Sequence, residues 1–287
     1  PLSRTAGIRK AAVFVALFGV LVVGTAFSQS EDKQLFQEAE SRFRAQDYEF
    51  ALEFYTTLAR DYPLSGYVPD AQFRIAVCMF RLNRPAEALE LFKLVESRYS
   101  SSRFMAFVPF WIGVIEYNNK NFKEAAYYLR NYLEMGDSSL VGQARLYLAV
   151  SENTLGNPDS SIELLEDMLS DTESAAIDPY ALILLSSLYI KQDRFADVLE
   201  LADKSDLGSL QEEQAQRLQL YKAEAYWHSE MTEEAVALYE ELLEAPSDIS
   251  SIAFQRLFIY NELMGNESVL QNVVNTAEIR LAGYPEI

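Results

Sequence analysis

The chain has 287 residues, of which 24 are Lys or Arg and 43 are Asp or Glu, so its formal net charge is −19 at pH 7. Nucleic-acid binding depends on clustered Lys and Arg that neutralise phosphates, and this acidic balance therefore argues against a nucleic-acid partner. A single histidine, His228, excludes a multi-histidine metal site, and a single cysteine, Cys78, excludes an internal disulfide.

Residues 1–30 have the pattern of an export signal. They contain no acidic residue, and an apolar run over residues 11–23 is followed by small residues. The basic residues before this run are Arg4, Arg9 and Lys10. The pattern predicts a signal peptide over residues 1–28, cleaved after Ser28, and hence a periplasmic or otherwise exported protein. The alternative is that residues 11–27 remain as an inner-membrane anchor, although this stretch is short for a span of roughly 20 residues.

Beyond residue 30, a small side chain returns at a nearly constant spacing. In the first copy it is Ala51, three residues after the aromatic Tyr48. Later copies follow at intervals of 36 or 37 residues, at positions 88, 125, 161, 198 and 235. These anchor residues are Ala51, Ala88, Ala125, Ser161, Val198 and Ala235. A fixed period of this length is typical of a solenoid, in which each repeat buries its apolar face by stacking on the next.

A second small side chain stands twelve residues before each anchor. These partner residues are Ala39, Ala76, Gly113, Ala149, Ser186 and Ala223. Two helices whose axes approach to about 8–10 Å leave room only for small side chains at their contact, so each repeat is predicted to be a pair of antiparallel helices. The nine prolines agree, because they stand in predicted first turns or outside helices and leave the helix interiors intact.

The small pair, the aromatic residue three before the anchor and Pro63, twelve after the first anchor, resemble the tetratricopeptide repeat. The resemblance implies an all-α fold, a right-handed α-solenoid of tandem helix-turn-helix repeats over residues 29–287. Six repeats are clear, near 32–68, 69–105, 106–141, 142–178, 179–215 and 216–250. A seventh, near 251–287, is degenerate, with Leu270 at the anchor position.

The segments between the first repeats share a motif, which reads Tyr, Pro or Ser, any residue, Ser, any residue, aromatic. It occurs as Tyr62-Pro63-Leu64-Ser65-Gly66-Tyr67 and as Tyr99-Ser100-Ser101-Ser102-Arg103-Phe104. With the long period, this motif resembles the repeats of the periplasmic outer-membrane assembly lipoproteins and of the Tol-Pal-associated periplasmic proteins. The resemblance implies a scaffold in a bacterial envelope, in outer-membrane assembly or envelope maintenance. The chain departs from these families by having Gln29 in place of a lipid-bearing cysteine, and by lacking an N-terminal coiled coil.

The sequence does not predict an enzyme. It contains no Gly-x-Gly, no P-loop and no Gly-x-Ser-x-Gly, and acid pairs such as Glu233-Glu234 fall on predicted outer helix surfaces. We therefore expect no catalytic residue, no cofactor and no metal ligand. Cys78 is interpreted as a buried small hydrophobe rather than a reactive thiol.

The candidate binding surface is the concave groove that the first helices of a tetratricopeptide solenoid line. Positions fourteen and seven before the anchors form a basic and aromatic set in an otherwise acidic chain, and Arg and aromatic side chains dominate interface hot spots. The candidate residues are Arg44, Arg74, Arg81, Trp111, Asn118, Tyr147, Lys191, Tyr221 and His228. In the alternative interpretation, the aromatic residues only pack between helices and the arginines pair with local acids. Phe36, Phe73 and Phe110, fifteen before their anchors, are predicted to be core.

These features predict an exported, non-enzymatic scaffold for a protein or peptide partner, which meets a membrane only if its N-terminal segment is uncleaved. One alternative is the recognition arm of a larger enzyme or transport component whose active domain lies beyond Ile287. The other is a structural protein that assembles with itself, end to end, through its last repeat.

Overall fold

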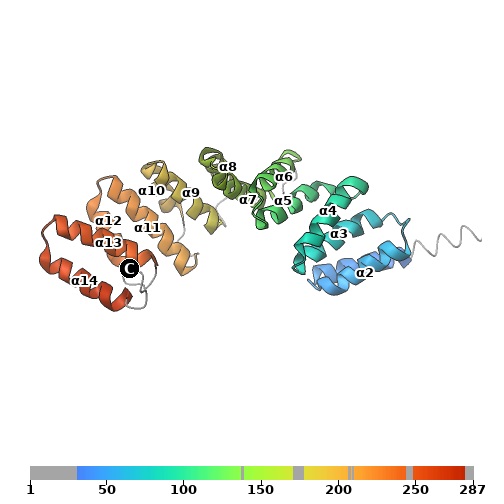
Figure 1. Cartoon of the computed structure of the whole chain (residues 1–287), viewed down its shortest axis with the longest axis horizontal. Helices are drawn as coiled ribbons and strands as arrows, with labels where there is room; N and C mark the ends of the chain where they lie inside the picture. Colours follow the sequence, from blue (N-terminus) through green and yellow to red (C-terminus); the bar gives the residue numbers. More distant parts are fainter. Residues whose placement is uncertain are drawn as a thin grey trace, which may run out of the picture. The chain divides into compact units, whose positions relative to one another are not determined.

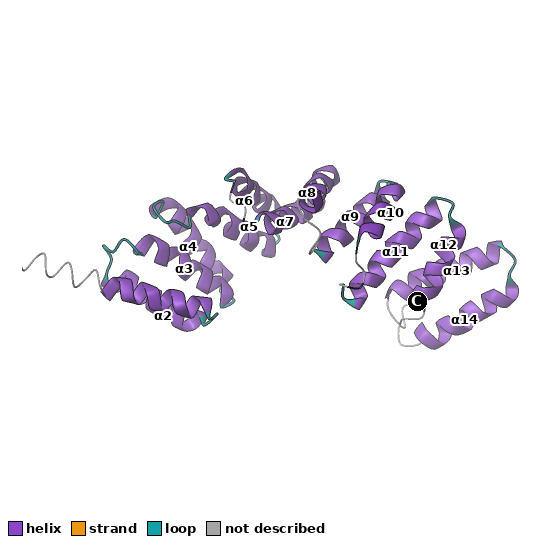
Figure 2. Cartoon of the chain, turned by 180° about the vertical axis from the view of Figure 1, so that it is seen from behind, coloured by secondary structure: helices purple, strands orange, loops and turns teal. Residues whose placement is uncertain are grey.

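The computed structural model describes residues 31–136, 139–170, 178–205, 208, 210–243 and 248–281, with side chains up to residue 275. All regular structure in these residues is helical, and they contain no strand (Figure 2). The expected signal peptide or anchor lies outside the described residues. Within them, no helix combines the length and the apolar character that a membrane crossing requires.

The helices follow one another in pairs, which Figure 1 shows in chain order from blue to red. The first helices of the pairs are residues 31–44, α3 (Val68–Arg81), α5 (Val108–Asn118), α7 (Val141–Thr154), α9 (Pro179–Lys191), α11 (Glu212–His228) and α13 (Asp248–Leu263). The second helices are α2 (Tyr48–Asp61), α4 (Pro85–Arg98), α6 (Phe122–Glu134), α8 (Pro158–Ser170), α10 (Phe195–Lys204), α12 (Thr232–Leu243) and α14 (Glu267–Leu281). One 3₁₀ turn, η1 (Met105–Phe107), precedes α5. The predicted all-α fold is confirmed, and the degenerate seventh repeat also forms a helix pair.

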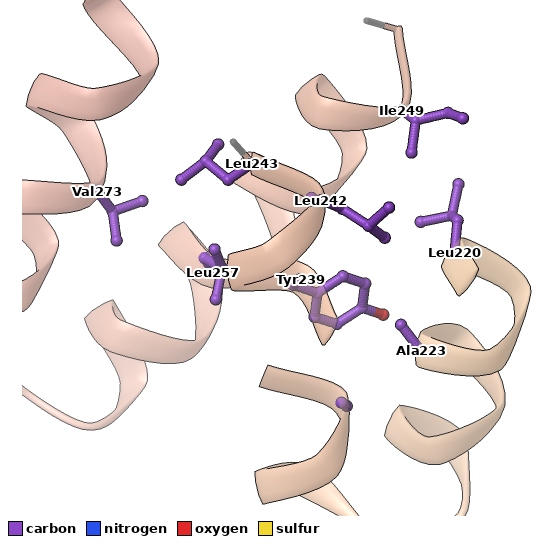
Figure 3. Packing of buried hydrophobic residues seen from close by; sticks show 10 residues of the cluster. Leu220, Ala223, Tyr239, Leu242, Leu243, Ile249, Leu257 and Val273 are labelled. Carbon is purple, nitrogen blue, oxygen red and sulfur yellow. The ribbon is translucent and has the colours of Figure 1, made fainter. Parts of the chain in front are cut away.

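The chain packs as two compact units, which divide within α7 between Ser151 and Glu152. In the first unit, one hydrophobic cluster joins helix 31–44, α2 and α3 around Tyr55, and the next joins α3, α4 and α5 around Phe92. In the second unit, α11, α12, α13 and α14 contribute to one cluster, which includes Tyr239 of α12 and Val273 of α14 (Figure 3). Burial of each large apolar side chain contributes about 1.5–3 kcal/mol, so neighbouring helix pairs hold each other in place.

The anchor and partner residues are buried as the repeat spacing predicts. Five anchors are fully buried and the sixth, Val198, is 1% exposed. The partner residues are buried as well. At Gly113 the helices approach so closely that an added Cβ would lie 2.7 Å from Cγ of Leu129. The contact between the two helices of this repeat therefore requires a small side chain, as predicted.

In the turn inside every repeat, the residue five positions before the anchor has a left-handed backbone conformation. These residues are Gln46, Asn83, Lys120, Gly156, Asp193, Glu230 and Gly265, with φ between 57° and 87°. The next N–H returns to the carbonyl five residues earlier, as from Arg84 to Met79 at 2.9 Å. This is the Schellman pattern, which ends the first helix and reverses the chain. A glycine at this position would have indicated such a turn in the sequence, but only two of the seven positions are Gly, so the sequence alone does not predict the turns.

The linker motif precedes the first helix of a repeat and hydrogen-bonds to the first helix of the repeat before it. Ser65 Oγ donates to Asp32 near the start of helix 31–44, and Ser102 Oγ donates to Asp70 of α3 at 2.9 Å. The aromatic residue that ends each motif stacks on the buried Phe of the preceding first helix. The ring pairs are Tyr67 with Phe36, at 4.9 Å between centroids, and Phe104 with Phe73, at 5.0 Å. The predicted burial of Phe36, Phe73 and Phe110 is confirmed, with at most 6% exposed.

Candidate protein-binding surface

Each candidate residue lies on the first helix of a pair. Five of them are the last residues of their helices: Arg44, Arg81, Asn118, Lys191 and His228. A positive charge at this position is favoured by the helix dipole, which accounts for part of the basic character without any ligand. Six candidates belong to the first unit, and Lys191, Tyr221 and His228 belong to the second.

Arg74 joins the first two repeats instead of facing open solvent. Its Nε donates to Oε1 of Glu40 at 2.8 Å and its Nη2 to Oε2 at 3.3 Å, and its side chain is 19% exposed. Its guanidinium carbon lies 4.4 Å from the ring of Phe43 and 4.2 Å from that of Phe104. The hydroxyl of Tyr55 also donates to Glu40, and burial, followed by this hydrogen bond, raises the pKa of Tyr55. For Arg74, the structure matches the interpretation in which the arginine pairs with a local acid.

The same three-residue network recurs in the second unit. Arg256 of α13 donates to both carboxylate oxygens of Glu224 at 2.9 and 2.7 Å, and Tyr239 donates to the same group at 2.8 Å. Burial raises the pKa of Glu224, but the hydrogen bonds from Arg256 and Tyr239 outweigh it, and the pKa lies below its ordinary value. We name these two clusters the Tyr-Glu-Arg networks.

Sequence reasoning missed Arg256, because it lies in the degenerate seventh repeat. A signal was present nonetheless. In both networks the Glu directly follows the small partner residue, and the Tyr stands four residues after the anchor. The Arg stands fourteen residues before the next anchor, which for Arg256 is Leu270 of the seventh repeat. The spacing places both arginines at equivalent positions, and the structure shows that each pairs with an acid of the preceding repeat.

Arg81 and Trp111 lie together on α3 and α5. Arg81 is exposed, and its guanidinium carbon is 5.5 Å from the centroid of the Trp111 ring. The half-buried Trp111 is held from behind by Phe80, with ring centroids 5.3 Å apart, and by Phe92 at 6.1 Å. Within the described residues, no ion pair joins Arg81 to a carboxylate. Its guanidinium therefore lies exposed beside the ring of Trp111, and among the described residues no acid neutralises its charge.

Tyr147 contacts Tyr117, a residue that was not among the candidates. Their ring centroids are 4.9 Å apart, in an edge-to-face arrangement, and Tyr117 also contacts Phe122. Burial, with a smaller effect of Tyr147, raises the pKa of Tyr117. Tyr117 precedes the exposed Asn118 at the end of α5. We define the aromatic strip as these two contacts between first helices of the first unit, Arg81 with Trp111 and Tyr117 with Tyr147.

The candidates of the second unit form no comparable cluster. His228 stacks on Phe195 with ring centroids 4.9 Å apart, and its Nε2 is 3.9 Å from Glu224. Lys191 is exposed at the end of α9, and Tyr221 is half-buried on α11. Arg44, in the first unit, is exposed and donates to the backbone carbonyl of Glu40 at 3.2 Å.

Two features bear on the chemistry available to the described residues, the state of Cys78 and the grouping of side chains that can bind metals. Cys78 is fully buried, and burial raises the pKa of its thiol to about 12, so it stays protonated at neutral pH and is a poor nucleophile. In the part of the chain that the structure describes, no group of three or more His, Cys, Asp or Glu could hold a metal ion.

Comparison with known proteins agrees with this geometry. Residues 36–102 match the family model of the tetratricopeptide repeat, and solved tetratricopeptide-repeat proteins superpose on most of the chain. The fold is an all-helical tetratricopeptide-repeat solenoid. This fold is typically a non-catalytic interaction scaffold. No curated protein matches the chain in sequence.

Three solved structures illustrate the likeness in fold between this chain and other proteins. The C-terminal part of a repeat-containing protein from Cytophaga hutchinsonii has a TM-score of 0.68 and 15% identity, over 88% of this chain and 97% of that one. PilF of Pseudomonas aeruginosa has a TM-score of 0.59 and 18% identity, over 80% and 98%. YrrB, described as having an unusual peptide-binding site, has a TM-score of 0.58 and 16% identity, over 72% and 100%. At such identities the likeness shows the fold alone.

Proposed function

We propose that this chain is an exported, non-enzymatic scaffold in a bacterial envelope, which binds an extended or acidic segment of a partner protein through the aromatic strip. Tetratricopeptide repeats imply a protein-interaction scaffold. The observation that carries the choice of surface is the contact of the exposed Arg81 with the ring of Trp111.

The chemistry of the strip supports a peptide ligand. Aromatic rings supply large contact areas at a low cost in side-chain entropy, and a guanidinium beside them can form two hydrogen bonds with a carboxylate. Arg74 is occupied by Glu40, whereas Arg81 keeps its donors available within the described residues. YrrB, which shares the fold, is described as a peptide-binding protein.

Export is supported by the sequence of residues 1–30 and by the resemblance of the linker motif to periplasmic repeat proteins. Under this proposal, N-terminal sequencing of the mature protein should start at Gln29. A membrane-bound product that still carries residues 1–28 would instead mean that the segment is a retained anchor.

Capture from the native envelope tests the binding surface. Arg81→Glu combined with Trp111→Ala should abolish cross-linked capture of the partner that the unmodified chain retains, with unchanged far-UV circular dichroism. The matched control is Glu240→Lys with Glu241→Lys, which changes two exposed residues of α12 and should leave capture intact. If the control loses capture and the strip variant keeps it, the partner binds the acidic surface and the proposal is wrong.

One feature favours the self-assembly alternative. α13 exposes Ile252, Ile259 and Leu263, by 37%, 43% and 78% respectively, at spacings of seven and four that align them on one helix face. Light scattering at several concentrations separates the two functions. A mass that rises with concentration, and that Leu263→Glu returns to the monomer value, would support self-assembly over the scaffold.

A further inference from the structure

The first unit has a second recessed surface, on the side of α3 away from the aromatic strip. It is an open groove of about 760 Å³ between α2 and α4, with α3 as its floor. Its apolar lining comprises Ala59, Ile75, Met79, Ala86 and Leu91. At about 100° per residue, Met79 lies roughly 160° around the axis of α3 from Arg81, so the groove and the strip face different directions.

The equivalent groove of the second unit, between α8 and α10 over α9, has about 350 Å³ and is occupied by polar side chains. Tyr189 donates to Glu166 at 2.8 Å, and Arg194 bridges Glu166 and Asp197 at 3.0 and 2.6 Å. These contacts run across the groove from α8 to α10. Hydrogen bonds thus cross that smaller groove, and among the described residues none crosses the groove between α2 and α4.

Three departures from the repeat pattern open the first groove. Five residues after the anchor, the other clear repeats carry a charged side chain: Lys93, Arg130, Glu166, Asp203 and Glu240. The first repeat has the small, uncharged Thr56 there, followed by Ala59. On the floor of the groove, Met79 stands where the other clear repeats have Arg, Glu or Tyr. Thr56 and Ala59 lie on α2 and Met79 on α3, and none of these three positions brings a charged side chain into the groove.

The walls of the groove favour a positively charged occupant. On α4, Glu87 and Glu90 line the rim with side chains 55% and 78% exposed, and each pairs with a nearby base, Arg84 at 2.6 Å and Lys93 at 3.9 Å. Arg60 on α2 lines the opposite wall and pairs with Asp61 at 2.7 Å. Exposed ion pairs of this kind contribute little, so two acids against one arginine leave the lining with a negative balance. The whole chain carries a formal charge of −19, so its long-range field attracts cations.

From this charge complementarity and the apolar floor, we propose that the groove between α2 and α4 docks the apolar face of a basic amphipathic helix. A helix presents apolar residues at i, i+3, i+4 and i+7 to such a groove, and its flanking Lys or Arg would face Glu87 and Glu90. Met79 is well suited to the floor, because its flexible thioether adapts to different side chains. The inference is independent of the aromatic strip.

A designed peptide tests the proposal directly. The probe is a fluorescein-labelled helix of about 18 residues, with Leu at the helical spacing and Lys elsewhere, titrated with the full chain and followed by fluorescence anisotropy. Two comparison peptides have the same Leu and Lys composition in scrambled order, or Glu in place of Lys. We expect the probe to bind at least about tenfold more tightly than either.

Groove variants locate the binding site. Thr56→Arg with Ala59→Leu installs the side chains that α6 carries at the same positions, Arg130 and Leu133, and is therefore compatible with a second helix. It should weaken probe binding by about tenfold or more. The control Glu240→Gln makes the same change in net charge at the equivalent position of α12, and should change affinity by less than about twofold.

A second pair of changes keeps the test decisive if the first variant fails to fold. Glu87→Lys with Glu90→Lys alters exposed side chains only; it should weaken the Lys probe and strengthen the Glu peptide. Equal affinity for the scrambled peptide, or loss of binding in Arg81→Glu/Trp111→Ala rather than in the groove variants, would overturn the proposal. So would self-association of the chain that disappears in Thr56→Arg/Ala59→Leu, because the occupant would then be a second copy.

Discussion

Replacement of Gly113 by Ala tests the helix contact on which the repeat depends. In an open helix the change would stabilise the protein by about 1 kcal/mol, because Ala is the better helix former. Here the new Cβ would lie 2.7 Å from Cγ of Leu129, 3.0 Å from its Cδ2 and 3.3 Å from its backbone N. Carbon atoms in contact prefer about 3.5–4.0 Å, so α5 and α6 would have to separate.

The sign of the effect follows from the surroundings of Leu129. This side chain is fully buried, so it cannot turn into open space, and overpacking in such a site costs about 1–3 kcal/mol. Set against the gain of about 1 kcal/mol in helix propensity, this cost gives an expected net loss of up to about 2 kcal/mol. For a chain of this size, each kcal/mol lowers the melting temperature by about 2–4 °C.

Urea unfolding followed by far-UV circular dichroism measures the change. Leu129→Val supplies the matched test, because it removes one methylene beside the new methyl group and should cost less in the Gly113→Ala background than alone. The expected coupling is at least about 0.5 kcal/mol. A higher urea midpoint for Gly113→Ala than for the unmodified chain would refute the close-contact argument.

Ser161→Ala should stabilise the fold by about 1 kcal/mol and so raise the urea midpoint, because its buried Oγ has no hydrogen-bond partner in the described residues. Ala88→Trp should unfold or split the helix stack, whereas Glu87→Trp should not, since Ala88 is fully buried and Glu87 is exposed; equal losses in a thermal melt would mean that the helix register is wrong. The pKa of Glu224 is lowered, so its stabilisation is present above the ordinary Glu pKa and is lost as pH falls through the lower, folded pKa. Glu224→Gln should therefore be less stable at neutral pH and lose less stability on acidification, which melts across an acidic pH series would show.

The candidate surface was only partly predictable, as two arginines of α3 illustrate. Arg74 and Arg81 are seven residues apart and share a helix face, so spacing alone treats them alike. In the structure Arg74 is held by Glu40 between two aromatic rings, and Arg81 is exposed beside Trp111. The two arginines differ because an acid, Glu40, lies across the helix contact from Arg74, and Glu40 is 34 residues away from Arg74 in sequence.

By itself, the sequence determined the helix pairs, their period and the small residues at their contacts, because a close helix approach admits only small side chains and each repeat must bury the same face. It also predicted the buried aromatic residues that the linker motif covers. Only the tertiary structure decided which polar side chains pair between repeats, that Tyr117 joins Tyr147, and that Thr56, Ala59 and Met79 open a groove. These features depend on contacts between separate helices, and a side chain's exposure there is set by its neighbour in space, which spacing along the chain does not specify.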